Sequence, residues 1–535
     1  MPDPAPSEHA PPALTAEAMR AADEYTIETY GIPSFTLMET AGRGCAEHIR
    51  TAHGPFGDAP VVVLCGKGNN GGDGLVVARR LLVTGATVRV VLTAPPDELR
   101  DDPARNMQLL RQLQEQSGDR LTIETAPAPT DLDDALPPPG TAALYVDALL
   151  GTGLTSALRE PIHSLVEQVN DRPAPTVAID VPTGLHSDTG AVLGTAVQAA
   201  STVTMAAPKV GLLVGEGPAH AGTVHTVDIG IPPFVLAEAA QRPGCVRQTT
   251  DAAVRAWWPE RPRDAYKYSV GTALVVGGAP RFTGAPRLAA QAAERNGAGY
   301  VTCACPDTVQ PTIAGALATV PTLPLPTTEE GIDAPAALDR LADERADAML
   351  VGPGLGRAPG TESFVRELVR TTDRPLVLDA DGLNACAGHM DDLAAHADGD
   401  WILTPHEGEF RRLAGEADLS DRVRTVQAYA ERWNVVLLLK GAPSIVAGPG
   451  GTTYVASTGT SALATAGTGD VLAGQCVGLL AQGLPPLAAA ASALHLGGAA
   501  AARYAQGHDA RSMVASDLVA ELPRAIRARL RTAAE

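Results

Sequence analysis

Lysine, aromatic residues and basic charge are all scarce in this sequence of 535 residues. Only four of the 41 basic residues are lysine, namely Lys67, Lys209, Lys267 and Lys440. Acidic residues number 61, which gives a net charge of −20. This charge excludes non-specific binding of nucleic acid, and anchoring to an anionic membrane, through a basic face. Because lysine and arginine are not interchangeable at a defined site, the four lysines are candidates for positions that require a point charge; a biased genome is the alternative.

Paired cysteines, a targeting segment and a long apolar run are also missing. Seven scattered cysteines, an odd number, argue against a disulfide framework. The opening residues MPDPAPSEHAPPA have neither the basic start nor the apolar core of a signal peptide, and we expect residues 1–13 to form a disordered proline-rich tail. Polar residues and prolines interrupt the most apolar stretch, residues 471–502, which therefore predicts packed helices and not a membrane span. We expect a soluble cytoplasmic protein.

Short apolar runs alternate with helical patterns along the chain, which predicts an α/β fold with mostly parallel sheets. The runs of the first half are residues 61–65, 87–93, 143–149, 176–182, 202–207 and 223–230. The pattern lapses over residues 239–250, which we predict to be a linker. It restarts with runs at residues 272–278, 300–306, 347–354, 375–381, 401–407 and 435–441. The sequence therefore predicts two α/β domains, at residues 14–238 and 251–535.

The first glycine-rich motif, GKGNNGGDG at residues 66–74, joins a predicted strand to a helix predicted over residues 75–83. Glycines let a backbone approach a ligand closely, and the N-terminus of a helix offers unpaired N–H groups to a phosphate. The spacing differs from the dinucleotide fingerprint and from the Walker loop. A simple tight turn is the alternative, but it needs one Asn or Asp, whereas this loop has Asn69, Asn70 and Asp73.

Two more strand ends carry a carboxylate followed by a glycine-containing turn. Asp147 precedes the loop of residues 151–157, and Asp180 precedes Thr183. Ligands of open α/β sheets bind at the carboxyl ends of the strands, so we expect these side chains to converge with the first glycine-rich loop. Oxygen ligands of this kind suit a simple cation as well as a sugar or an amide.

The first half resembles the NAD(P)H-hydrate epimerase family over about residues 14–235. The resemblance rests on LMETAG (37–42), GNNGGDG, DALLGTGL, IDVPTGL and APKVGL (207–212). It implies a Rossmann-like three-layer domain in which Asp180 is a base and Lys209 is an acid or a charge stabiliser. It also implies a potassium ion on Asn70, Asp147 and Thr183. The substrate contacts that it implies are Asn69, Asn70, Gly71, Gly72, Asp73, Gly151, Thr152, Gly153, Leu154, Thr155, Ser156, Ala157 and Asp180.

The second half has a different glycine-rich motif, TAGTGDVLAG at residues 465–474, at the start of a predicted helix. Its glycines and the helix N-terminus form a site for an anion, and Asp470 lies in the first helical turn beside that site. A carboxylate next to a phosphate repels it, so a carboxylate at this position indicates a function. The function we favour is to accept a proton from a hydroxyl that attacks phosphorus. The alternative is an acidic residue that only favours the helix dipole.

Other strand ends of the second half also carry polar residues. Asp379 and Asp381 are candidates for a magnesium ion held through water. His406 and Lys440 follow two further strands, and Lys440 suits a nucleotide phosphate. The loop GPGLG at residues 352–356 allows close approach to its backbone.

This second half resembles the ribokinase-like ADP- or ATP-dependent NAD(P)H-hydrate dehydratases over about residues 255–525. The motifs are YKYSVGTALVVGG (266–278), FTGAPRLAAQAAERNGAGYVT (282–302), GPGLG, LDADGLN, TPHEGE, KGAPS and ATAGTGDVLAG. The resemblance implies that the hydrated nicotinamide nucleotide contacts Ala285, Gly356, His406 and Asp470. It implies that the adenine nucleotide contacts Lys440, Gly441, Ala442, Pro443, Ser444 and Gly469. Lys267 corresponds to the lysine of the family's opening motif.

Together the resemblances predict a bifunctional enzyme of nicotinamide nucleotide repair. The first domain would interconvert the (R) and (S) epimers of NADHX and NADPHX with potassium. The second would dehydrate the (S) epimer with ADP and magnesium, releasing AMP and phosphate. The main alternative is a ribokinase-like small-molecule kinase fused to a nucleotide-binding module. Alanine-rich residues 486–505 could pack against another subunit, and we expect a homo-oligomer; the choices of ADP or ATP and of NADH or NADPH stay open.

Overall fold

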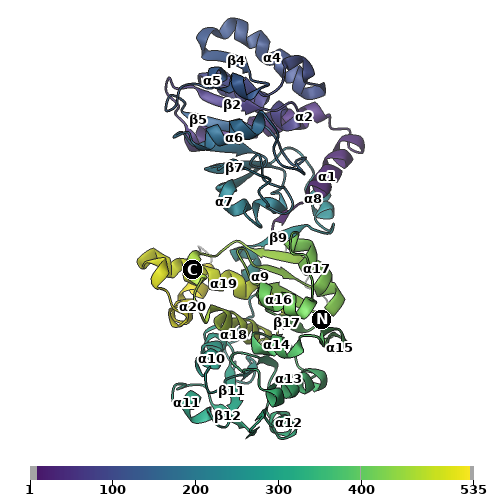
Figure 1. Cartoon of the computed structure of the whole chain (residues 1–535), viewed down its shortest axis with the longest axis vertical. Helices are drawn as coiled ribbons and strands as arrows, with labels where there is room; N and C mark the ends of the chain where they lie inside the picture. Colours follow the sequence, from purple (N-terminus) through teal and green to yellow (C-terminus); the bar gives the residue numbers. More distant parts are fainter. Residues whose placement is uncertain (1–8, 398, 531–535) are drawn as a thin grey trace. The chain divides into compact units, whose positions relative to one another are not determined.

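The computed structural model describes residues 9–397 and 399–530, which form two compact units. One unit is residues 12–246, and the other is residues 247–530 together with residues 9–11. Figure 1 shows the first unit in purple to teal and the second in teal to yellow. Each unit contains a mostly parallel sheet packed with helices, so the predicted two-domain α/β class is confirmed.

The first unit has three layers around a parallel sheet with the strand order β4-β3-β2-β5-β6-β7-β8. The strands of this sheet are β2 (Val61–Cys65), β3 (Val88–Leu92), β4 (Leu121–Thr125), β5 (Leu144–Ala148), β6 (Thr176–Ile179), β7 (Ser201–Met205) and β8 (Thr223–Val227); the short strand β1 (Pro12–Ala13) is not part of it. The helices are α1 (Ala16–Glu28), α2 (Ser34–His53), α3 (Asn69–Val83), α4 (Asp101–Ser117), α5 (Leu132–Ala135), α6 (Ile162–Asn170), α7 (Gly217–Ala221) and α8 (Pro233–Ala239).

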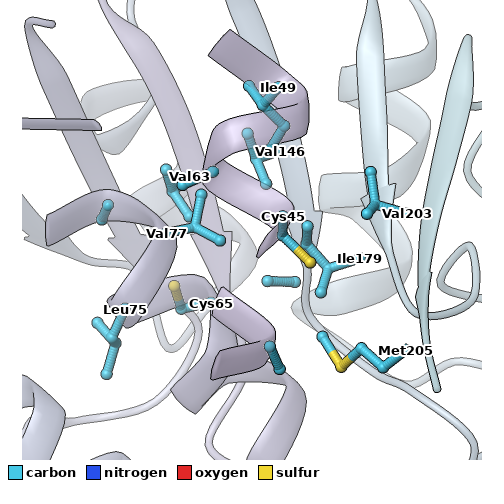
Figure 2. Packing of buried hydrophobic residues seen from close by; sticks show 14 of the residues in the cluster. Cys45, Ile49, Val63, Cys65, Leu75, Val77, Val146, Ile179, Val203 and Met205 are labelled. Carbon is cyan, nitrogen blue, oxygen red and sulfur yellow. The ribbon is translucent and has the colours of Figure 1, made fainter. Parts of the chain in front are cut away.

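Alternate residues of each strand face opposite helical layers. Val61 and Val63 of β2 pack in a core with α2, α3 and α4, whereas Val62 and Leu64 pack with α5 and α6. Figure 2 shows the first of these cores, where side chains from α2 and α3 meet side chains from β2, β5, β6 and β7. The two cores hold the carboxyl ends of the parallel strands at one edge of the sheet.

Helix α3 begins at Asn69, six residues before the predicted start, and includes most of the first glycine-rich motif. The glycines there serve close packing. A Cβ on Gly71 would overlap the backbone oxygen of Gly66, and a Cβ on Gly42 of α2 would overlap the side chain of Val76. Glycine is a poor helix former, so the motif alone predicts a loop, and tertiary packing reverses that preference.

The second unit is built on a sheet with the order β9-β20-β19-β18-β17-β16-β15-β10-β11-β12. Its strands are β9 (Val246–Thr249), β10 (Thr272–Val276), β11 (Tyr300–Pro306), β12 (Thr322–Leu325), β15 (Ala348–Val351), β16 (Leu376–Leu378), β17 (Trp401–Leu403), β18 (Val436–Leu439), β19 (Ile445–Ala447) and β20 (Thr453–Ala456), with a small hairpin of β13 (Thr327–Thr328) and β14 (Gly331–Ile332). The sheet is parallel except where β19 runs antiparallel to both β18 and β20.

The helices of this unit are α9 (Asp251–Trp257), α10 (Gly284–Arg295), α11 (Gln310–Ala314), α12 (Ala334–Ala342), α13 (Pro359–Thr371), α14 (Asp381–Cys386), α15 (Met390–Ala394), α16 (Glu407–Ala414), α17 (Arg422–Trp433), α18 (Thr468–Ala481), α19 (Pro486–Gly507) and α20 (Ala515–Leu530). Almost every residue of α19 up to residue 501 is buried in its own domain. The reason for expecting an oligomer through this segment therefore does not hold. In the part of the chain that the structure describes, no helix has the length and apolar character needed to cross a membrane.

Residues 9–13 of the predicted tail and residues 246–249 of the predicted linker have a defined backbone structure. Of the predicted tail, residues 1–8 lie outside the described residues. From residue 9 the backbone is bound to the second unit, because Gln248 N donates to Pro11 O at 3.0 Å and Thr250 Oγ1 donates to His9 O at 2.6 Å. Within the predicted linker, residues 246–249 form β9. Prolines still accept hydrogen bonds through their carbonyls, so a proline-rich segment can lie along a strand.

Candidate active sites

The first unit contains a cavity of about 900 Å³ at the carboxyl edge of its sheet. It is formed by the loop and first turn after β2, the loop after β5, and residues that follow β6 and β7. The predicted site residues that line it are Asn69, Asn70, Asp73, Gly151, Thr152, Gly153, Leu154, Asp180 and Lys209. The structure places the other predicted residues outside the lining. Gly71 and Gly72 are buried in α3, Thr155, Ser156 and Ala157 lie farther along their loop, and Asp147 and Thr183 do not line the cavity either.

Lys209 is buried and bound to Asp180 in this cavity. Its side chain is 2% exposed, and Nζ donates to Asp180 Oδ1 at 2.5 Å. The backbone oxygens of Met205 and Ala207 also accept from Nζ, at 3.0 and 3.3 Å. Burying an ammonium group is costly unless it is paired and hydrogen-bonded, as it is here. The arrangement fixes a positive charge beside one oxygen of Asp180.

The other carboxylate oxygen of Asp180 faces the loop after β5. A Cβ on Gly151 would stand 3.6 Å from Asp180 Oδ2 and 3.5 Å from Asn70 Cβ. Gly151 therefore lies between these two side chains, where a larger residue would fill the cavity. Asp180 itself has a φ of +69°, a left-handed conformation that is costly for a residue other than glycine. Such strain is common at functional sites.

The three predicted cation ligands lie next to the same loop. Asp147 is fully buried; its Oδ1 accepts from Thr183 Oγ1 at 2.7 Å and its Oδ2 from Thr183 N at 2.8 Å. Burial raises the pKa of Asp147 to about 6. The side-chain amide of Asn70 is also buried, and neither its oxygen nor its nitrogen has a hydrogen-bond partner. A buried amide of this kind has unused capacity to bind an ion or a ligand.

The second unit gathers Asp379, Lys440 and Asp470 at the carboxyl edge of its sheet. Asp379 follows β16, Lys440 follows β18, and Asp470 lies in the first turn of α18. Lys440 Nζ donates to Asp379 Oδ1 at 2.8 Å and lies 3.8 Å from Glu409 Oε2. A Cβ on Gly469 would stand 3.5 Å from Lys440 Nζ. The structure thus brings Lys440, Gly469 and Asp470 together, as the sequence predicts.

The electrostatics of this second site favour a base at Asp470. Burial, followed by the nearby charge of Asp379, raises the pKa of Asp470 to about 7, while Lys440 opposes the shift. Burial disfavours the charged form of Lys440, but Asp379 and Glu409 outweigh it and raise the pKa of Lys440. A carboxylate with a pKa near the working pH is suited to accept a proton.

The GPGLG loop brings Ala285 and Gly356 to the same edge. Gly356 has a φ of +74°, and its N–H donates to Asp381 Oδ2 at 2.8 Å. A Cβ on Gly354 would lie 3.2 Å from Ala285 Cβ, so the loop packs on the start of α10. Asp379, a candidate magnesium ligand, is 1% exposed and bound to Lys440. Asp381 is therefore the more accessible of the two carboxylates.

His406 has a structural role that the sequence did not predict. Its Nδ1 accepts from Gly408 N at 3.0 Å and from Glu409 N at 3.3 Å, which caps the N-terminus of α16. The imidazole is 55% exposed, and its Nε2 lies 3.4 Å from Glu409 Oε1. Next to it, the predicted nucleotide-binding turn is closed by Gly441 N, which donates to Ser444 Oγ at 3.2 Å.

The four lysines do not share one kind of position. Lys67 is 68% exposed at the rim of the first cavity, where its Nζ lies 3.4 Å from Glu98 Oε2. Lys267 lies over the rings of Tyr268 and Tyr300, with Nζ 4.7 and 4.9 Å from the ring centroids. Tyr300 begins β11, so this lysine is at the amino edge of the sheet, opposite Asp470. Lys267 therefore lies away from the group formed by Lys440, Gly469 and Asp470.

Sequence reasoning missed one wall of the first cavity. Ala16, Met19, Arg20 and Asp23 of α1 all line it. Their spacing of three or four residues places them on one helical face. Asp23 on this helical face was the signal that the sequence offered. A single aspartate on an amphipathic helix, however, does not distinguish a ligand-binding site from an ordinary solvent-exposed face.

Comparison with known proteins assigns a family to both halves of the chain. A family model described as YjeF-related protein N-terminus matches residues 34–211, and one described as NAD(P)H-hydrate dehydratase matches residues 273–524. Bifunctional NAD(P)H-hydrate repair enzymes from Salinibacter ruber and Moorella thermoacetica are 69% and 41% identical to this chain, each over 96% of both proteins.

A solved structure matches the second half alone. The ADP/ATP-dependent NAD(P)H-hydrate dehydratase from Bacillus subtilis, co-crystallised with ATP and Mg²⁺, is 30% identical over 52% of this chain and 97% of its own, with a TM-score of 0.44. The full-length relatives cover both units, so they establish the family of the whole chain, which this partial match does not. The chain belongs to the family of bifunctional NAD(P)H-hydrate repair enzymes.

Proposed function

We propose that this chain repairs hydrated NADH and NADPH in two steps at two separate sites. The first unit interconverts the (R) and (S) epimers, and the second dehydrates the (S) epimer with ADP. The observation that carries the proposal is that each unit has its own lysine–carboxylate pair at the carboxyl edge of its own sheet. Full-length relatives named as bifunctional repair enzymes support it. Because these substrates are intracellular nucleotides, we also propose a cytoplasmic location.

The epimerase step would take place in the cavity of the first unit. The hydrated ring carries a hydroxyl on a carbon that is bonded to the ring nitrogen, so this carbon can exchange its configuration. Asp180 would transfer a proton at that hydroxyl, and Lys209 would stabilise the negative charge that Asp180 carries once it has given its proton. The buried amide of Asn70 and the loop around Gly151 would hold the nucleotide.

The dehydratase step would use Asp470 as its base. Asp470 would accept the proton of the ring hydroxyl as that oxygen attacks the terminal phosphoryl group of ADP, and AMP would leave. The ring nitrogen would then expel phosphate, and loss of a proton from the neighbouring carbon would restore the C=C bond. Lys440 and the N–H groups at the start of α18 would offset the phosphate charge.

Two cations fit the residues present. Asn70, Asp147 and Thr183 would hold potassium, because their oxygens lie around one loop and the Asn70 amide has no partner of its own. Bound there, potassium would supply positive charge close to the nucleotide. Asp381 would hold magnesium through water, and magnesium would offset phosphate charge in the second site. Both assignments rest on the chemistry of these oxygen donors.

The reaction can be followed by the absorbance of reduced nicotinamide. Purified (S)-NADHX is mixed with the protein, magnesium and either ADP or ATP. We expect NADH to return with ADP and to return more slowly with ATP. Faster recovery with ATP would reverse the proposed co-substrate. Absence of recovery with both, together with phosphorylation of a hydroxymethylpyrimidine or a thiazole alcohol, would contradict the dehydratase and support the kinase alternative.

A further inference from the structure

Helix α1 supplies a carboxylate to the first cavity that the function described above does not use. Asp23 is half-buried and lines the cavity together with Asp180 and Lys209. It lies on the same face of α1 as Ala16, Met19 and Arg20, which also line the cavity. Other acidic residues of this helix, Glu24 and Glu28, are exposed and do not line it.

The start of α1 is fastened to the segment that carries Lys209. Leu14 N donates to Pro208 O at 2.8 Å, and Val210 N donates to Leu14 O at 3.1 Å, so Leu14 pairs with Lys209 as in a sheet. Thr15 Oγ1 then caps the helix by accepting from Ala18 N at 3.1 Å. These bonds fix the position of α1, and with it Asp23, relative to the catalytic lysine candidate.

Asp23 belongs to one electrostatic cluster with Asp73, Asp180 and Lys209. Burial raises the pKa of Asp23 to about 6; Lys209 opposes the shift, and Asp180 and Glu24 of the same helix add to it. Asp73 is buried, and burial, Asp180 and Asp23 together raise its pKa well above the usual range, while Lys209 opposes the shift. One lysine therefore faces three carboxylates, of which only Asp180 is bonded to it. Asp23 is left to exchange protons near neutral pH.

The chemistry of the proposed epimerisation calls for such a group. Inversion of the ring carbon breaks its C–O bond on one face and forms a new C–O bond on the other. The leaving hydroxyl takes a proton and departs as water while the ring nitrogen lone pair forms a C=N bond. Water then adds to the opposite face and loses a proton, so the two proton transfers cancel. A single acid–base group reaches only one face of a flat ring.

We propose that Asp23 is the second acid–base residue of the epimerase cavity, serving the face of the nicotinamide ring that Asp180 does not serve. The assignment rests on the epimerase function proposed above. It makes α1 part of the catalytic machinery. The chain accordingly uses Asp180 and Asp23 in alternation: in one direction Asp180 gives the proton to the leaving hydroxyl and Asp23 takes one from the entering water, and in the other direction the roles exchange.

The test is Asp23→Asn, with Glu28→Gln on the same helix as the matched control and Asp23→Glu as the conservative variant. The readout is exchange of purified (R)-NADHX into the (S) form, separated by chromatography, with the rate without protein subtracted. Asp23→Asn is expected to lower kcat for exchange about 100-fold, the usual size of one acid–base contribution, while KM changes less than about twofold. Glu28→Gln should match the unaltered protein, and Asp23→Glu should recover part of the rate.

A pH profile separates catalysis from structure. The unaltered protein should show a change in exchange rate near pH 6 that Asp23→Asn lacks, and Arg20, Glu24, Asp73, Asp180 and Lys209 are the neighbouring charges that set its position. An Asp23→Asn rate equal to that of Glu28→Gln overturns the proposal. So does a rise in KM with kcat unchanged, which would make Asp23 a binding residue. Absence of exchange in the unaltered protein would instead contradict the epimerase function itself.

Discussion

The two sites of this chain use the same pair of residue types in different ways. In the first, Lys209 is bound directly to Asp180, which is the proposed reactive carboxylate. In the second, Lys440 is held by Asp379, and the proposed base Asp470 is a third group nearby. Lys209 places its positive charge directly on the reactive carboxylate, whereas Lys440 is already bound to Asp379 and leaves burial to raise the pKa of Asp470. The comparison shows that the carboxylate to which the lysine is bound, more than the lysine itself, determines the environment of the reactive carboxylate in each site.

The largest effect should follow the loss of Asp470. We expect Asp470→Asn to reduce the rate of dehydration about 1,000-fold, because no other carboxylate of that site is positioned at the start of α18 to take the hydroxyl proton. Epimer exchange should stay unchanged. Recovery of NADH absorbance from (S)-NADHX measures the first rate and chromatography the second. A parallel loss of both activities in a folded protein would show that the two sites are not separate.

A smaller loss is expected in the first site. Asp180→Asn should reduce epimer exchange about 100-fold and leave dehydration of (S)-NADHX unchanged. The fold should survive, because Lys209 Nζ keeps its bonds to Met205 O and Ala207 O. Thermal unfolding checks this point. If the variant exchanges epimers at the normal rate, Asp180 is not the reactive carboxylate.

Topology accounts for the placement of the predicted site residues, whereas the local structure around them was predicted less well. Asp147 lies near the end of a buried parallel strand, and Asp180 and Lys440 directly follow two others. The parallel strands of one sheet end at the same edge, so the placement of these residues follows from topology. The predicted start of α3 was wrong because the sequence alone does not distinguish glycines that pack closely against a neighbouring backbone from glycines of a loop. Strand β4 was missed because it lies at the sheet edge and is mostly half-buried.

Two residues show the limit of local patterns. Lys267 lies in a recognisable motif, yet the strand that begins at Tyr300 places it at the opposite edge of the sheet from Asp470. Asp23 lies in no recognised motif, yet backbone bonds to the segment of Lys209 bring it to the cavity. Both positions depend on contacts between segments far apart in sequence, which spacing along the chain does not encode.

Removing one proposed potassium ligand should affect only the first site. Asn70→Ala deletes the buried amide, and the loss of one contact to a charged group costs about 1.5–3 kcal/mol. The potassium concentration for half-maximal epimer exchange should therefore rise roughly tenfold or more. Gln116→Ala removes an exposed amide of α4 that does not line the cavity, and is the control. An unchanged potassium requirement in Asn70→Ala, or equal exchange rates in potassium and in choline, would contradict the cation site.

The pH dependence of the two steps should differ. The raised pKa of Asp470, about 7, means that the group is protonated below neutrality and cannot act as a base there. A base with this pKa is about 90% deprotonated at pH 8 and about 10% at pH 6, so kcat/KM for dehydration should fall roughly tenfold between them. Epimer exchange should change at lower pH, in keeping with Asp23. A flat dehydration profile across this range would rule out Asp470 as the titrating base.

The most direct test of two independent sites is complementation between variants. Asp180→Asn and Asp470→Asn are each mixed with ADP, magnesium, potassium and an epimer mixture of NADHX, first alone and then together, and the reduced-nicotinamide absorbance is followed. Alone, the first should stop at the (S) fraction and the second should recover almost nothing. Together they should recover NADH from both epimers at the rate of the unaltered protein at matched site concentrations. Recovery that still stops at the (S) fraction in the mixture would contradict the account.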